Sequence, residues 1–136
     1  MKNNVIDKTR LKQFRAQAKE MQLIAETINA MRETIGAKVS GMDGTGRSQG
    51  DGTATERTVE KLLSLENKYL GKLREYADER DVIERALGVL DPNERALIRL
   101  YYFDLHNWEE VAKLMNYSYQ HIHRIHAAAL EKLKQS

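Results

Sequence analysis

Cysteine is absent from the 136-residue chain. Its absence excludes disulfide bridges, thiolate zinc sites and cysteine nucleophiles, and it is compatible with a reducing cytoplasm. No apolar run approaches the ~18–20 residues that span a bilayer, and the N-terminus has no signal-peptide core. We therefore expect a soluble, cytoplasmic protein that does not contact a membrane.

Proline and glycine are also scarce over most of the chain. A single proline and few β-branched runs favour an all-α fold. Six of the eight glycines fall within residues 36–54, mixed with Ser, Thr, Asp and Arg. Such a segment loses much backbone entropy on ordering and has little to bury, so we predict a flexible linker there. The spacing of a phosphate-binding loop is not present.

Signatures of enzymes are missing as well. The sequence contains no nucleophile elbow, dinucleotide fingerprint or metal-ligand set, and we expect no catalysis, no cofactor and no metal. His121, His123 and His126 lie close in sequence, but on a helix His121 points away from the other two. We expect these histidines on a solvated surface that faces DNA.

Two long stretches carry apolar residues at three- and four-residue steps, which predicts two amphipathic helices. Residues 1–35 contain the first helix, from residue 7, and residues 55–90 form the second. Arg32 interrupts the first stripe, whereas Glu66 and Arg80 interrupt the second. The helices could pair within one chain or form a coiled coil between two chains, and the pattern does not choose. The stripe residues are Leu11, Phe14, Ala18, Met21, Ala25, Ile28 and Ile35, then Val59, Leu62, Tyr69, Leu73, Tyr76, Ile83, Leu87 and Leu90.

Residues 91–136 contain clear helix-start signals. Asp91 can cap a helix that has Pro92 at its first position and Glu94 where a capping box closes. Asn107, with Glu110 three residues later, repeats this pattern. The predicted core comprises Leu97, Leu100, Tyr101, Phe103, Trp108, Val111, Ala112, Met115, Ile122, Ile125, Ala129, Leu130 and Leu133, with Tyr102 on a partner surface.

A tight turn is predicted between the second and third of these helices. Asn116 tolerates the left-handed conformation that the turn needs, and Ser118 can cap the helix that follows. A short helix, a tight turn and a longer helix with a polar N-terminal face form a helix-turn-helix. The predicted fold is therefore all-α: two long amphipathic helices, a Gly-rich linker between them, and a three-helix domain.

The segments ERALIRLYYF, NWEEVAKLMNYS and HIHRIHAAALEKLK resemble region 4 of sigma factors, which reads the −35 promoter element. The resemblance extends from Leu90 to Lys134. It implies that Tyr119, Gln120 and Arg124 touch base edges. His121 and His123 stand where the family usually has arginines that meet phosphates or partner proteins, and Ser118 begins the same surface. Gln can bond bidentately to adenine and Arg to guanine.

The charge of the helix-turn-helix segment is balanced, with six Lys/Arg and six Asp/Glu in residues 91–136. One such domain should bind DNA weakly, because neutral histidine adds little to phosphate affinity. Dimerisation through the long helices would supply two contacts, so we expect a homodimer.

The whole plan also resembles, more loosely, small late-transcription regulators of phages and prophages in Gram-positive bacteria. That resemblance implies an activator acting beside RNA polymerase on double-stranded DNA. Nothing in the chain resembles sigma region 2, so we do not expect a complete sigma factor. Two alternatives stay open: a small terminase-like packaging oligomer, and a polymerase- or sigma-binding protein that does not bind DNA.

Overall fold

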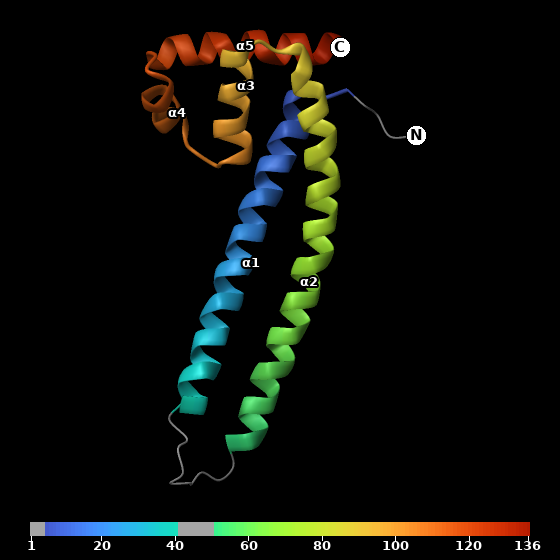
Figure 1. The fold of residues 1–136 in the computed structure, drawn as a ribbon, viewed down its shortest axis with the longest axis vertical. Coiled ribbons are helices and arrows are strands. Elements are labelled where there is room, and N and C mark those ends of the chain that lie inside the picture. Colours follow the sequence, from blue (N-terminus) through green and yellow to red (C-terminus); the bar gives the residue numbers. More distant parts are fainter. Residues whose placement is uncertain (1–4, 41–50) are drawn as a thin grey trace. The chain divides into compact units, whose positions relative to one another are not determined.

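The computed structural model describes residues 5–40 and 51–136. Within these ranges it contains helices and no strand, which confirms the all-α fold (Figure 1). A 3₁₀ turn, η1, follows α2 at Leu87–Val89, and a π-helical segment, η2, follows α3 at Arg99–Phe103. The described α-helices are α1 (Lys8–Ser40), α2 (Asp51–Ala86), α3 (Pro92–Ile98), α4 (Trp108–Met115) and α5 (Tyr119–Gln135).

The two long helices extend further than the sequence pattern predicts. α1 ends at Ser40 rather than Ile35, and α2 begins at Asp51 rather than Thr55, so both ends of the predicted linker 36–54 are helical. Adding residues to an established helix is easy compared with nucleating one, and a single Gly36 costs only about 1 kcal/mol. The prediction of flexibility for residues 41–50 lies outside the described residues.

The chain divides into two compact units. The first, here the helix-turn-helix unit, combines residues 1–19 with residues 75–136, and the second, here the arm unit, comprises residues 20–74. The sequence pattern places a domain boundary at residue 91. In the structure, the start of α1 and the end of α2 belong to the same compact unit as the three C-terminal helices.

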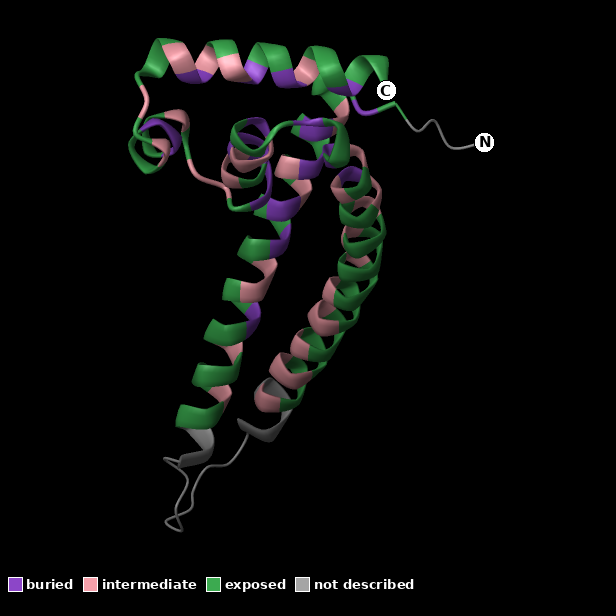
Figure 2. Ribbon diagram, turned by 45° about the horizontal axis from the view of Figure 1, so that its top comes forward, coloured by how far each residue is buried: buried purple, intermediate pink, exposed green. Residues whose placement is uncertain are grey.

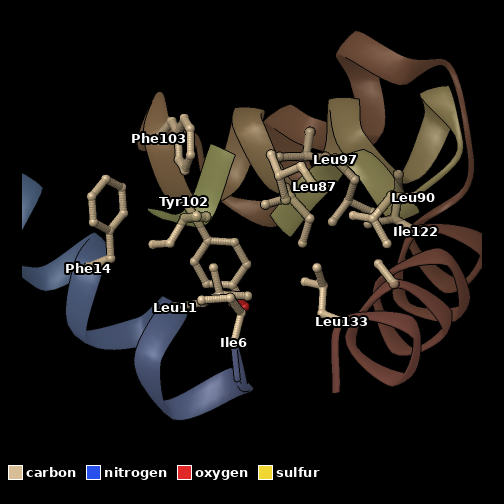
Figure 3. Packing of buried hydrophobic residues seen from close by; sticks show 14 of the residues in the cluster. Ile6, Leu11, Phe14, Leu87, Leu90, Leu97, Tyr102, Phe103, Ile122 and Leu133 are labelled. Carbon is tan, nitrogen blue, oxygen red and sulfur yellow. The ribbon is translucent and has the colours of Figure 1, made fainter. Parts of the chain in front are cut away.

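One hydrophobic cluster holds the helix-turn-helix unit together (Figure 3). Leu11 from α1, Leu87 from η1 and Leu97 from α3 are each fully buried. Because Leu11 is a member of this cluster, the start of α1 is part of the core. Each fully buried leucine contributes ~1.5–3 kcal/mol to the stability of the fold by leaving water. Other buried members of the cluster are Ile6, Phe14, Ile83, Leu90, Ile98, Tyr102, Phe103, Val111, Ala112, Ile122, Ala129 and Leu133.

The predicted core is confirmed for most of its members, with one exchange between neighbours. Tyr101 is half-buried, and Tyr102, predicted to line a partner surface, is 1% exposed. That prediction was wrong because η2 departs from the 3.6-residue period: the Asp104 N–H bonds to the Arg99 carbonyl five residues earlier. Leu100, Trp108, Met115, Ile125 and Leu130 pack against the cluster and are half-buried.

The charged residues that interrupt the two apolar stripes have partners in the structure. Arg32 forms an ion pair with Glu66 inside the arm unit. Arg80 lies over the ring of Phe103 inside the helix-turn-helix unit, 5.0 Å from its centroid. Each interruption therefore falls where another side chain can accommodate its charge.

In the arm unit α1 and α2 pair within one chain. Lys72 Nζ lies 2.6 Å from Glu20 Oε1, and the Arg32–Glu66 pair joins the same two helices. Met21 and Ile28 of α1 are buried, but the described side chains of α2 in this unit are only half-buried or exposed (Figure 2). The pairing with α1 therefore buries no described side chain of α2 in the arm unit completely.

No helix in the described ranges is both long enough and apolar enough to cross a membrane.

Candidate nucleic-acid interface

Capping boxes define where α3 and α4 begin. The Asp91 carboxylate accepts from the Glu94 N–H and the Glu94 carboxylate accepts from the Asp91 N–H, both at 3.0 Å. Asn107 and Glu110 exchange the same two bonds at 2.8 and 2.9 Å. Each box satisfies two backbone donors that a helix start leaves open. Both predicted helix starts are confirmed.

The turn between α4 and α5 has the predicted geometry. Asn116 adopts φ 61° and ψ 43°, in the left-handed region. The Tyr117 N–H bonds back to the Ala112 carbonyl at 3.0 Å, which closes the turn. The Ser118 hydroxyl then accepts from the His121 N–H at 3.1 Å and caps α5. A short helix, a tight turn and a 17-residue helix follow one another as in a helix-turn-helix.

α5 has an inner and an outer face. Ile122, Ala129 and Leu133 are buried against the core. Gln120 and Arg124, four residues apart, project from the opposite face and are exposed. Ser118 and Tyr119 are also exposed at the start of the helix, whereas His121 and His123 are half-buried. The structure thus brings four of the six predicted site residues to the surface of the first two turns.

His121 is half-buried beside the start of α3. It lines a groove of about 450 Å³ between the start of α3 and α5, together with Arg124 and the carboxylates of Asp91 and Glu94. The His121 ring also meets Tyr117 edge-on, with ring centroids 4.6 Å apart. His121 is therefore part of the packing beside the exposed face of α5.

A continuous series of contacts joins Arg15 of α1, through four aromatic rings, to the first turn of α5. The Arg15 guanidinium lies 4.0 Å from the Tyr101 ring centroid, and Tyr101 stacks on Trp108 at 3.8 Å. The Trp108 centroid lies 5.1 Å from that of His123, which in turn meets Tyr119 edge-on at 4.4 Å. Aromatic pairs of this kind contribute ~0.5–1.5 kcal/mol each beyond area burial. The contact with His123 therefore orients the exposed Tyr119 ring.

Comparison with known families bears on this same segment. Residues 86–135 match the model of the family described as Sigma-70, region 4. The C-terminal segment is therefore similar to sigma-70 region 4. The match begins at the last residue of α2, includes η1, and covers all three C-terminal helices, but it takes in less than half of the chain. No curated protein and no solved structure matches the chain. Sigma region 4 is a DNA-binding helix-turn-helix, and the matched segment is similar to it.

Arg15 supports the sigma-like segment, residues 86–135, from outside the matched residues. Its Nε donates to the Tyr101 carbonyl at 2.8 Å and its Nη2 to the His106 carbonyl at 3.1 Å. These bonds hold the segment between η2 and α4, in which Leu105 has a positive φ of 64°. Sequence reasoning missed Arg15, because a basic residue on an amphipathic helix gives no local sign of a distant carbonyl.

His126 lies in the core of the helix-turn-helix unit, whereas the sequence interpretation placed it on a solvated face that meets DNA. That interpretation was wrong: His126 is 7% exposed, and its Nε2 is 2.7 Å from the Tyr102 hydroxyl. Burial, and then the charges of Lys8, His123 and Lys12, lower the His126 pKa to about 4. Burial likewise raises the pKa of Tyr102. The neutral imidazole and the phenol therefore share a buried hydrogen bond.

The His123 ring lies between Trp108 and Tyr119, and its Nε2 is buried without a hydrogen-bond partner among the described residues. Within residues 5–40 and 51–136, no three His, Cys, Asp or Glu side chains gather as a metal site would require. The histidines of α5 are accounted for by packing.

Proposed function

We propose that the protein is a sequence-specific transcription regulator that reads DNA with α5. The observation that carries this proposal is the exposed pair Gln120 and Arg124 on the outer face of a capped recognition helix, inside a segment that matches sigma region 4. A recognition helix inserts its N-terminal half into the major groove, where amide and guanidinium groups distinguish bases.

Each exposed residue has a role that fits its chemistry. Gln120 bonds bidentately to adenine, and Arg124 bonds to guanine O6 and N7. Tyr119 packs its ring against a thymine methyl group, and Ser118, at the start of α5, contacts a phosphate. His121 and His123 fix the first turn of α5 and flank the phosphates, to which they add little charge at pH 7.

The regulator acts beside RNA polymerase rather than as a complete sigma factor. The looser resemblance to phage and prophage late-gene regulators supports an activator of such genes, working as a homodimer in the cytoplasm of a bacterial host. The balanced charge of residues 91–136 supports paired binding, because a single neutral domain gains little from the phosphate backbone. A packaging oligomer would bind duplex DNA without selecting a motif, and a protein that binds only polymerase would not bind duplex DNA.

Selection of bound duplexes from a random library tests the proposal. The full chain should enrich one motif, and Arg124→Ala should relax that motif at a guanine position. Arg85→Ala removes an exposed arginine from α2 and should leave the motif unchanged. Binding without enrichment would favour packaging, and failure to bind any duplex at low salt would favour a protein partner. Either result would refute sequence-specific reading.

A further inference from the structure

The arm unit carries two exposed leucines that its own helix pair does not cover. Leu63 and Leu70 of α2 are 54% and 57% exposed and lie seven residues apart, two turns along the same side. They border a groove of about 520 Å³ between α1 and α2, whose lining includes Ile28 and Tyr69. An apolar groove with leucines along its edge is a typical contact surface for another helix.

These leucines belong to a second seam on α2. Glu60, Leu63, Asn67, Leu70 and Arg74 follow steps of three, four, three and four residues, and all five are exposed. That spacing is the one by which a helix packs along a partner helix. The first seam of α2, which includes Leu62 and Tyr69, is half-buried in the pairing with α1.

The order of residues along the second seam indicates the partner. The seam begins with an acid, Glu60, ends with a base, Arg74, and has Asn67 at its midpoint. A second copy laid antiparallel would set Leu63 beside Leu70 and each Glu60 beside an Arg74 of the other copy. A parallel copy would set Glu60 beside Glu60 and Arg74 beside Arg74. The antiparallel arrangement brings opposite charges together, which attract, whereas the parallel arrangement brings like charges together, which repel.

We infer that the second seam of α2 is a homodimer interface, in which two copies pair antiparallel about a two-fold axis at Asn67. The groove beside α1 receives the leucines of the second copy. Residues 20–74 contain eight Lys/Arg and eight Asp/Glu, so two arm units carry no net repulsion. A two-fold interface uses the same patch on both copies, as this seam requires. The inference gives the homodimer of the proposed function its surface.

Sedimentation equilibrium of the full chain without DNA tests the interface. The wild-type protein should be a dimer, and Leu63→Gln with Leu70→Gln should raise the dissociation constant by tenfold or more, roughly the loss of 1.4 kcal/mol. Leu23→Gln is the matched control, because Leu23 is 63% exposed but does not line the groove. Far-UV circular dichroism verifies that each variant is folded. A wild-type monomer, or a dimer that ignores the double substitution, would overturn the inference.

A charge exchange tests the antiparallel register. Glu60→Arg and Arg74→Glu should each weaken self-association by roughly tenfold, since each homodimer then contains two like-charge contacts. An equimolar mixture of the two variants should recover wild-type association, because every contact is then between opposite charges. No recovery in the mixture would refute this register. Since DNA is absent, these results are independent of whether α5 reads a sequence.

Discussion

At position 126 a titratable side chain lies in the core of the helix-turn-helix unit. His126 has a folded-state pKa of about 4 against an ordinary value of 6.5. Between these values the unfolded chain binds a proton that the folded protein does not, so stability falls as pH decreases from 6.5 towards 4. The slope approaches about 1.4 kcal/mol per pH unit.

Chemical denaturation at pH 7.5 and pH 5 measures this effect. The free energy of unfolding should be lower at pH 5, and His126→Phe should remove most of the difference. Glu84 and Glu110 do not produce the same pH dependence, because their pKa values are lowered from 4.5 in the folded protein. The stability that these two carboxylates contribute is lost mainly at more acidic pH. An unchanged pH dependence in His126→Phe would show that His126 is not the group responsible.

Single residues differ in how well the sequence reveals them. Asp91, Asn107 and Ser118 could be identified as caps because a cap bonds to a backbone N–H two or three residues away. Tyr102 and His126 could not, since their burial depends on an irregular turn and on a partner 24 residues distant. The exposure of Gln120 and Arg124 follows from the period of α5, but their contacts with bases remain predictions.

At the scale of elements, the turn before α5 depends on a residue that accepts a left-handed backbone. Asn116→Ala should destabilise the protein by about 1 kcal/mol, because a Cβ is disfavoured at φ 61° and Ala lacks the local hydrogen bonding of Asn. Asn116→Gly should be close to neutral, since Gly adopts this conformation without strain. Urea denaturation of both variants measures the difference, and equal stability of Ala and Gly would contradict the role assigned to the turn.

Helices were predictable where an apolar period and a cap coincide. The starts of α3, α4 and α5 agree with their capping signals. The ends of α1 and α2 bordering the glycine-rich segment have weaker signals, and there the helices continue past the predicted bounds. The sequence left open whether α1 and α2 pair within a chain, because that choice depends on contacts such as Arg32–Glu66.

For the molecule as a whole, we expect the sigma-like C-terminal segment to depend on residues outside the family match. A fragment of residues 86–136 lacks Ile6, Leu11, Phe14 and Ile83, all of which are at most 1% exposed in the full chain. Losing four such side chains, at ~1.5–3 kcal/mol each, is comparable to the whole stability of a small domain. The fragment should therefore not unfold cooperatively.

Thermal denaturation followed by circular dichroism tests this dependence. Leu11→Ala in the full chain should cost ~2–5 kcal/mol, whereas Leu23→Ala, at a site that is 63% exposed, should have little effect. A fragment with a melting transition as sharp as that of the full chain would contradict the account. The sequence could not predict this dependence, because residue 11 and residue 97 are far apart along the chain and only the fold joins them.

In the proposed function, α5 reads bases through Gln120 and Arg124. The affinities of Gln120→Ala and Arg124→Ala for a selected duplex and for a scrambled one, at fixed salt, test this proposal directly. Gln135→Ala, an exposed glutamine at the far end of α5, is the control. Gln120→Ala and Arg124→Ala should each lose ~1–3 kcal/mol of binding free energy on the selected duplex and little on the scrambled one. Equal losses on both duplexes, or none, would contradict base reading by α5.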